Sequence, residues 1–257
     1  MRALIVERKG SILTLKLNRP EVRNALDNTM RSELMEMFDA AKGDETVRVI
    51  VLTGVGKAFC AGGDLKGMGT DSPEEVANRL SKSHILLRKM VSLEKPVIAA
   101  VNGAAAGMGC NLVFASDLAI ASEEAIFIQA FIRIGLIPDF GGMFFLPRLI
   151  GLVKSKELVF FGDTINASEA ERIGLINRVV PHQMLEAEAQ KWAQRLAEAP
   201  TRAIGMSKRI LTRSWNLDFE TALQEELRAQ VECSQSMDHK EGVKAFKERR
   251  PPKFIGG

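Results

Sequence analysis

One carboxylate, Asp139, stands in a segment that otherwise consists of glycine, proline and large apolar side chains, GLIPDFGG at residues 135–142. Burial beside apolar groups raises the pKa of a carboxylate, which suits a general base that must take up a proton and release it again. The structural alternative is an aspartate in a Pro-Asp turn whose side chain caps a helix that begins near Gly141. The residues of this segment alone favour the structural alternative.

Two glycine-rich loops can present free backbone amides to a ligand. The first loop, AFCAGGDL at residues 58–65, follows a strand-like segment, and its paired glycines let the main chain approach a ligand closely. The second loop, VNGAAAGMGCN at residues 101–111, leads into a helix, whose first amides lack intrahelical acceptors and attract negative charge. Two such donors can form an oxyanion hole around a carbonyl oxygen. The alternative is that both loops are tight strand-to-helix turns, since a glycine-rich turn is a weak signal.

Short apolar runs alternate with longer helical patterns around these loops. Strand-like segments cover residues 47–53, 96–102 and 118–121, while helical patterns cover residues 73–93 and begin again near Gly107. This alternation predicts an α/β fold built from crossover units, in which both loops lie near the ends of adjacent strands.

The two ends of the chain show other patterns. The N-terminal MRALIVERKGSILTLKLNRP alternates in period two around a turn at residues 8–10, which predicts a hairpin, and it lacks the apolar stretch of a signal peptide. After about Pro181 amphipathic helices dominate, with breaks near residues 199–200 and 216–218. Their apolar faces must pack on the core or on another subunit. We therefore expect a cytoplasmic protein with a helical C-terminal part.

Composition and charge exclude several classes of protein. A chain of 257 residues that is 46% hydrophobic and 26% charged is long enough for one sizeable core and needs no membrane. Its net charge is +3, from 35 basic against 32 acidic residues, which is too mild and too evenly spread for a nucleic-acid binder. The three cysteines lie far apart without a Cys/His cluster, so neither a disulfide framework nor a metal site is indicated.

Several motifs, taken in their order, resemble the enoyl-CoA hydratase/isomerase family, also called the crotonase superfamily. They are LNRPEVRNAL, AFCAGGDLKGM, KPVIAAVNGAAAGMGCNL and GLIPDFGG, and the resemblance continues into the terminal EGVKAFKERRPPKF. It implies a crotonase-like α/β spiral of ββα units and a C-terminal helical region that forms trimers, commonly a dimer of trimers. We accordingly divide the chain into a core with the acyl-CoA site at residues 1–197 and an oligomerisation region at residues 198–257.

The resemblance also implies the ligand and the oxyanion hole. The substrate is a coenzyme A thioester whose carbonyl oxygen accepts hydrogen bonds from the backbone N–H groups of Gly63 and Met108. Many relatives carry alanine in place of Gly63 and glycine in place of Met108, but only the main-chain N–H is required. Proton removal next to the thioester gives an enolate, which two preorganised donors in a dry site stabilise. No metal or cofactor is needed, and coenzyme A enters as part of the substrate.

The acid/base positions depart from the hydratase pattern. Hydratases carry two glutamates where this chain has Asn111 and Phe131, so the usual two-glutamate hydration is not expected. Asp139 stands where hydratases usually have glycine, and an aspartate there resembles the dienoyl-CoA isomerases and the ring-epoxyphenylacetyl-CoA isomerases. With this resemblance we interpret Asp139 as the general base. An apolar wall beside it is expected from five phenylalanines, Phe127, Phe131, Phe140, Phe144 and Phe145.

Coenzyme A recognition is inferred from the same resemblance. The NRPEVRNAL segment places Arg23 and Ala25 near the adenosine, and Lys66 can help to neutralise phosphate. Further substrate contacts are expected from the loops and from the segment around the base, at Ala61, Asp64, Leu65, Asn111, Phe131 and Phe140. Asp64 also stands at a helix N-cap position, which favours a structural role for its carboxylate. Phe246 and Arg249 correspond to residues that contact coenzyme A from a neighbouring subunit, although a solvated basic tail is an equal alternative.

The preferred function is an acyl-CoA isomerase that moves a double bond, or rearranges a ring-derived acyl-CoA, through a thioester enolate. The nearest alternative is an enoyl-CoA hydratase in which Asp139 orients water. A third alternative is a non-catalytic acyl-CoA-binding or RNA-associated member of the family, against which the mild net charge and the carboxylate in an apolar segment argue. We expect a homotrimer or homohexamer that binds neither nucleic acid nor membranes.

Overall fold

The computed structural model describes residues 2–64 and 69–257, so the predicted substrate contacts at Leu65 and Lys66 lie outside the described residues. A six-stranded sheet forms one layer, with the strand order β1-β2-β3-β5-β7-β10. Its strands are β1 (Leu4–Lys9), β2 (Ile12–Leu17), β3 (Val49–Gly54), β5 (Val97–Val101), β7 (Leu118–Ser122) and β10 (Arg178–Val180). β1 and β2 form the predicted antiparallel hairpin, and the other neighbouring pairs of this sheet are parallel.

A smaller sheet has four short strands in the order β4-β6-β8-β9. They are β4 (Ala58–Cys60), β6 (Ala104–Ala106), β8 (Ile126–Ile128) and β9 (Thr164–Asn166). β4, β6 and β8 are parallel to one another, whereas β9 is antiparallel to β8. Sequence patterns do not predict this sheet, because a strand of three residues is too short to show alternation in period two.

The chain repeats a strand-strand-helix unit. The units are β3-β4-α2 with α2 at Pro73–Ser92, β5-β6-α3 with α3 at Met108–Phe114, and β7-β8-α4 with α4 at Gly142–Phe161. In each unit the first strand joins the larger sheet and the second joins the smaller sheet, so the chain winds as a spiral. The prediction of an α/β fold built from crossover units is confirmed.

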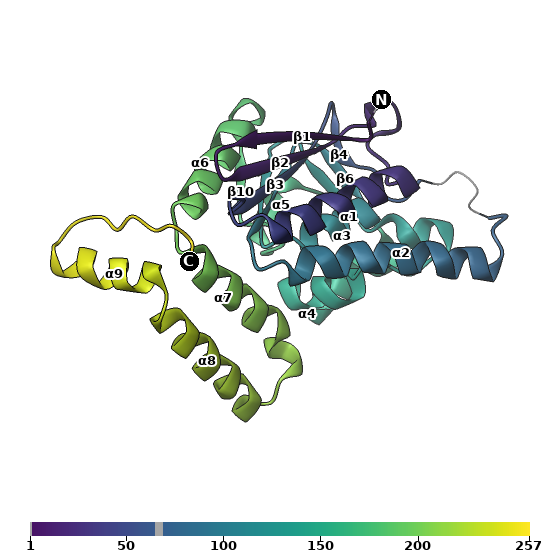
Figure 1. Ribbon diagram of the computed structural model, residues 1–257. Helices are drawn as coiled ribbons and strands as arrows, with labels where there is room; N and C mark the ends of the chain where they lie inside the picture. The colour runs from purple at the N-terminus through teal and green to yellow at the C-terminus, as the bar shows by residue number, and fades with distance from the viewer. Residues whose placement is uncertain (1, 65–68) are drawn as a thin grey trace.

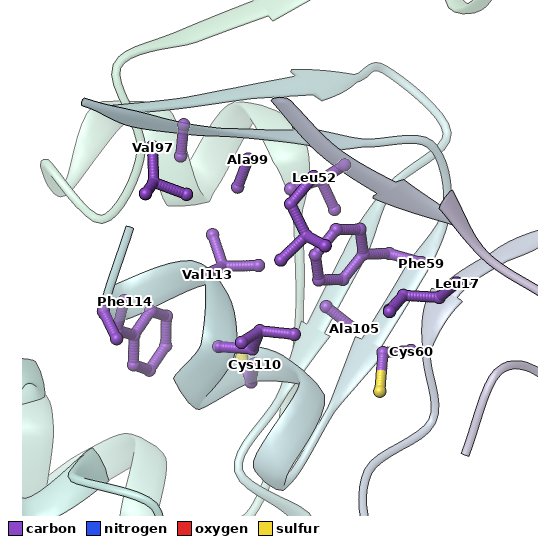
Figure 2. Close-up of a cluster of buried hydrophobic side chains, with 14 of the residues drawn as sticks. Leu17, Leu52, Phe59, Cys60, Val97, Ala99, Ala105, Cys110, Val113 and Phe114 are labelled. Atoms are coloured by element: carbon purple, nitrogen blue, oxygen red, sulfur yellow. The ribbon is translucent and has the colours of Figure 1, made fainter. Parts of the chain in front are cut away.

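The main core lies between the two sheets and the helices that cover them. Figure 2 shows Leu52 from β3, Phe59 from β4 and Val113 from α3 gathered in one cluster. Leu52 and Phe59 are fully buried, and burial of an apolar side chain of this size contributes about 1.5–3 kcal/mol. Helix α1 (Asn28–Gly43) covers the same core, and it begins where Asp27 accepts a 2.8 Å hydrogen bond from the Met30 N–H.

The strands end with β10, as predicted, and the rest of the chain is helical. Helix α5 (Ala167–Arg172) precedes β10, and helix α6 (Leu185–Ala197) packs its alanines against the outer face of the larger sheet. The remaining helices are α7 (Thr201–Arg213), α8 (Phe219–Ser234) and α9 (Met237–Lys247). Figure 1 shows α8 and α9 extending away from the two sheets. Within the described part of the chain, no helix has both the length and the hydrophobicity needed to cross a bilayer.

Candidate active site

Three loops meet at one edge of the smaller sheet. β4, β6 and β8 run parallel, so their carboxyl ends lie side by side, and the segments that follow them begin at Ala61, Gly107 and Gln129. The first two are the glycine-rich loops, and the third passes through the 3₁₀ turn η2 (Ala130–Ile134) to reach Asp139. The carboxyl ends of parallel strands are a frequent location of ligand sites in α/β proteins.

The loop after β4 leaves the N–H of Gly63 free. The Leu26 N–H donates a 2.8 Å hydrogen bond to the Gly62 carbonyl, and the Asp64 N–H donates a 3.1 Å bond to the Leu26 carbonyl. These bonds hold the loop on either side of Gly63, whose own N–H has no acceptor among the described residues. Gly62 has a φ of 104°, which a residue with a side chain rarely adopts.

Within the described residues, the loop after β6 leaves the N–H of Met108 without an acceptor. The Gly107 N–H donates a 2.8 Å bond to the Ile128 carbonyl, and Gly107 turns the chain with a φ of 52° and a ψ of −120°. Met108 is the first residue of α3, so its N–H has no intrahelical acceptor. Its side chain is buried.

The two loops are in direct contact. A Cβ atom added to Gly62 would stand 2.9 Å from the Ala106 carbonyl oxygen and 3.6 Å from the Met108 nitrogen. A Cβ atom added to Gly109 would stand 2.1 Å from the Cys60 carbonyl oxygen, so α3 approaches β4 this closely only because Gly109 lacks a side chain. Two free amides on adjacent backbones can bind one carbonyl oxygen and stabilise negative charge on it.

The Asp139 carboxylate is partly buried, and its Oδ1 atom is buried without a hydrogen-bond partner among the described residues. Burial raises the pKa of Asp139 to about 6, against the opposing positive charges of Arg31 and Arg79. Helix α4 begins after Gly141 and no side chain caps it, so the alternative of a capping aspartate is wrong. A carboxylate with this pKa can take up and release a proton near neutral pH.

A chain of hydrogen bonds fixes the backbone of Asp139. Its carbonyl oxygen accepts a 2.7 Å bond from the Asn111 side-chain amide and a 2.8 Å bond from the Gly142 N–H. The Asn111 Oδ1 atom in turn accepts a 2.8 Å bond from Gln129 Nε2, and both amide side chains are buried. Phe140, the next residue, has a left-handed φ of 46°, which turns the chain into α4. Asn111 therefore lies beside the predicted base, and its contact with substrate stays a prediction.

The predicted apolar wall has one member directly on the glycine-rich loops. Phe131 is buried, and its ring lies 3.6 Å from the point where a Cβ atom at Gly107 would stand. Phe127 and Phe140 are buried in the core. Phe144 and Phe145 form an edge-to-face pair on α4. Phe131 therefore covers the turn that presents the second free amide.

Four of the predicted coenzyme A contacts gather beside the first glycine-rich loop. Arg23 is an exposed residue, and its backbone carbonyl accepts a 2.9 Å hydrogen bond from the Ala61 N–H. The Arg19 guanidinium donates a 2.7 Å bond to the Ala25 carbonyl and lies 3.1 Å from the Asp64 carboxylate. The Asp64 carboxylate is thus held in place by an ion pair.

A single chain does not bring Phe246 and Arg249 to this site. Phe246, on α9, is 86% exposed, and Arg249 follows the end of that helix. In Figure 1, α9 lies far from α1 and α3, which carry residues beside the glycine-rich loops. The predicted contact of these two residues with coenzyme A stays a prediction.

A buried arginine that the sequence motifs do not indicate lies beside the site. Arg31, on α1, is 4% exposed, and its Nη2 atom lies 4.0 Å from the Met108 Sδ atom. A signal was present, because Arg31 lies in the buried stripe of α1, which starts at Met30 and continues with Leu34, Phe38 and Ala41 at helical spacing. A cation on the apolar face of an amphipathic helix is rare unless it has a partner.

The glycine-rich loops carry two cysteines, Cys60 and Cys110. No group of three His, Cys, Asp or Glu side chains within residues 2–64 and 69–257 could hold a metal ion. Cys60 and Cys110 are buried, and burial raises the pKa of each thiol to about 12. Both thiols therefore stay protonated and behave as small apolar side chains.

Comparison with known proteins gives one consistent class. A family model for enoyl-CoA hydratase/isomerase matches residues 7–257. A probable enoyl-CoA hydratase of Rhodobacter capsulatus is 43% identical over 95% of each chain, and a 1,2-epoxyphenylacetyl-CoA isomerase of Escherichia coli is 37% identical over 100% of this chain and 99% of its own. A solved enoyl-CoA hydratase structure from Bacillus anthracis superimposes with a TM-score of 0.95 at 35% identity, covering 99% of this chain and 100% of the other.

The chain therefore belongs to the enoyl-CoA hydratase/isomerase family and has the crotonase-like α/β spiral that its motifs predicted. Its relatives include proteins named as hydratases and a protein named as an isomerase, so membership alone does not choose between the two reactions. That choice depends on the acid/base residues of this chain.

Proposed function

We propose that the protein is an acyl-CoA isomerase in which Asp139 moves a proton between two carbons of the acyl group. The observation that carries this proposal is the Asp139 carboxylate, whose Oδ1 atom is buried and unpaired within the described structure and whose pKa is raised to about 6. A base with this pKa is ionised at neutral pH and still holds a proton well enough to return it. The resemblance to the 1,2-epoxyphenylacetyl-CoA isomerase supports ring-derived acyl-CoA thioesters as substrates beside simple 3-enoyl thioesters.

In the proposed reaction the thioester carbonyl oxygen accepts hydrogen bonds from the free N–H groups of Gly63 and Met108. The Asp139 carboxylate removes a proton from the carbon next to this carbonyl, and the C–H electron pair moves into the thioester to form an enolate. The proton then passes from Asp139 to the far carbon of the conjugated system, which shifts the double bond and restores the carboxylate. The reaction gains and loses no atoms. Removal of one such oxyanion donor typically costs about 3 kcal/mol of barrier.

The two positions that carry glutamates in hydratases support this choice. The Asn111 side-chain amide donates a hydrogen bond to the Asp139 carbonyl and accepts one from Gln129. Because an amide cannot exchange a proton usefully at neutral pH, Asn111 cannot act as an acid or base. Phe131 lies against the turn that presents the oxyanion donor. Neither residue offers a carboxylate to activate water.

We further propose that coenzyme A lies along the segment that carries Arg23, Ala25 and Ala61, and that a homotrimer or homohexamer supplies Phe246 and Arg249 from a neighbouring subunit. Helices α8 and α9 support the assembly, because they carry exposed apolar side chains that include Phe219, Leu223, Leu227, Val231, Val243 and Phe246. Apolar helix faces of this kind are normally covered by another surface.

An enoyl-CoA hydratase is the second candidate, favoured by the 43% identity to a probable enoyl-CoA hydratase. In that reaction Asp139 would orient a water molecule for addition to a 2-enoyl thioester. The test gives wild type and Asp139→Asn a 3-enoyl-CoA and follows the ultraviolet absorbance of the conjugated 2-enoyl product. A rise with wild type that the variant loses supports the isomerase. No rise, with water added to a 2-enoyl-CoA by the wild type, supports the hydratase.

A further inference from the structure

The Arg31 guanidinium is buried without a carboxylate partner. Its Nε atom has no hydrogen-bond partner, and no ion pair within 4.0 Å joins it to an acid in the described part of the chain. Its Nη1 atom donates a 3.3 Å bond to Asn28 Oδ1, and its Nη2 atom touches the Met108 sulfur at 4.0 Å. A buried cation without a partner costs stability unless negative charge stands nearby.

Two of the charged groups around Arg31 already have partners. Asp27, at the start of α1, lies 3.4 Å from Arg19, and its carboxylate also caps the helix. Arg79, which faces Arg31 from α2, pairs with Asp71. Each of these two charges is therefore offset mainly by its own partner, Asp27 by Arg19 and Arg79 by Asp71.

Among the described residues, two further titratable groups act on the charge of Arg31. Cys60 on β4 is uncharged, because burial holds its pKa at about 12. The Asp139 carboxylate is the other group, and its positive neighbour Arg31 lowers its pKa while burial raises it. Because no ion pair locks Asp139 to Arg31, the unpaired Oδ1 atom stays free for a substrate.

We propose that Arg31 supplies one fixed positive charge to both ends of the proton transfer, the Asp139 carboxylate before the transfer and the thioester enolate after it. This inference rests on the function proposed above. When Asp139 takes the proton, negative charge leaves the carboxylate and develops on the oxygen bound by the Met108 N–H. Arg31 contacts the Met108 sulfur, and its charge acts on the Asp139 carboxylate, so the cation keeps a neighbouring anion throughout. A charge that is already in place needs no reorganisation during the reaction. Arg31 acts through these groups as a positioning residue.

The first measurement is the pH at which Asp139 is half protonated. Infrared difference spectra of its carboxyl band, recorded across a pH series, give this midpoint. The band is identified by its loss in Asp139→Asn, so the measurement does not depend on turnover. We expect a midpoint near 6 in the wild type, a rise of about one pH unit in Arg31→Met, and a midpoint close to wild type in the charge-conserving Arg31→Lys. The matched control Arg79→Gln should move the midpoint less, because Asp71 already offsets that charge.

The second measurement is kcat for 3-enoyl-CoA isomerisation at a pH above every midpoint, where Asp139 is ionised in all variants. At that pH we expect the kcat of Arg31→Met to be about tenfold below the wild-type kcat, with little change in KM. The kcat of Arg31→Lys should lie close to the wild-type value. Should Arg31→Met fail to fold, Arg31→Gln is measured in the same way.

An unchanged Asp139 midpoint in a folded, uncharged Arg31 variant would overturn the proposal. A raised Asp139 midpoint with an unchanged kcat above every midpoint would overturn the part of the proposal in which Arg31 stabilises the enolate. Failure of the proposed isomerase function looks different, since isomerisation would then be absent in the wild type or survive Asp139→Asn, whatever the infrared midpoints are.

Discussion

The side-chain amide of Asn111 donates a 2.7 Å hydrogen bond to the backbone carbonyl of Asp139. Asn111 belongs to α3, the helix whose first residue presents the candidate oxyanion donor Met108. One short helix therefore positions both the donor and the turn that carries the candidate base. This contact ties the turn that carries the candidate base to the helix that presents the candidate oxyanion donor.

Asn111→Ala is expected to lower kcat for isomerisation by about tenfold to a hundredfold, because a small displacement of a reacting group is costly. KM should change less. The free energy of unfolding should fall by about 1–3 kcal/mol, since the buried Gln129 amide loses its acceptor. Steady-state kinetics and urea unfolding measure the two effects.

Gln129→Met is the control for Asn111→Ala. It removes the outer bond and keeps the contact between Asn111 and Asp139, so stability should fall while kcat stays near wild type. Equal kcat in Asn111→Ala and wild type would mean that the turn holds Asp139 without help.

Isomerase activity is expected to depend on a single ionisation on the acid side. Asp139 must be ionised to act as a base, and burial raises its pKa to about 6, so kcat/KM should fall tenfold per pH unit below about pH 6. The measurement is kcat/KM against pH with a 3-enoyl-CoA. An acid limb near the ordinary aspartate pKa of about 4 would contradict the assignment.

Asp139→Asn is expected to abolish isomerisation and yet stabilise the fold at neutral pH. The folded pKa is raised from 3.8 to about 6, so the folded state binds the proton more tightly than the unfolded state does. Wild-type stability therefore declines as pH rises from about 4 to about 6, by about 1–3 kcal/mol, and stays at the lower value above that range.

Urea unfolding of both proteins at neutral pH and near pH 4 checks this prediction. At neutral pH the free energy of unfolding should be higher for the variant than for the wild type. This difference should shrink toward pH 4, where the carboxyl is protonated in the folded wild type. A variant that is less stable than wild type at neutral pH would show that contacts of the charged carboxylate outweigh its burial.

Gly109→Ala is expected to destabilise the protein by about 1–3 kcal/mol and to lower isomerase activity. Its Cβ atom would stand 2.1 Å from the Cys60 carbonyl oxygen, which forces α3 away from β4 and separates the two free amides. Gly43→Ala, at the last residue of α1, is the matched control, because nothing lies within 4 Å of its Cβ position. Thermal unfolding of the two variants should separate them, and similar melting temperatures would refute the close approach.

Much of the fold could be predicted from local pattern. Strands of five or six residues, such as Val97–Val101, lie in apolar runs, and α2 shows its helical spacing over its whole length. The smaller sheet escaped prediction, because strands such as Ala104–Ala106 have too few residues to show a period and are held by long-range pairing. Yet this sheet sets the edge at which the candidate site assembles.

By itself, the sequence determined the family, the two glycine-rich loops, the absence of carboxylates at positions 111 and 131, and the presence of one at Asp139. Only the tertiary structure decided that Asn111 holds the backbone of Asp139, 28 residues away, and that Arg31 touches Met108, 77 residues away. It also decided the pKa of Asp139, since burial and neighbouring charge exist only once the chain is packed. Motifs are local and can be read along the chain, whereas the electrostatics of a site depend on residues that meet only in the folded protein.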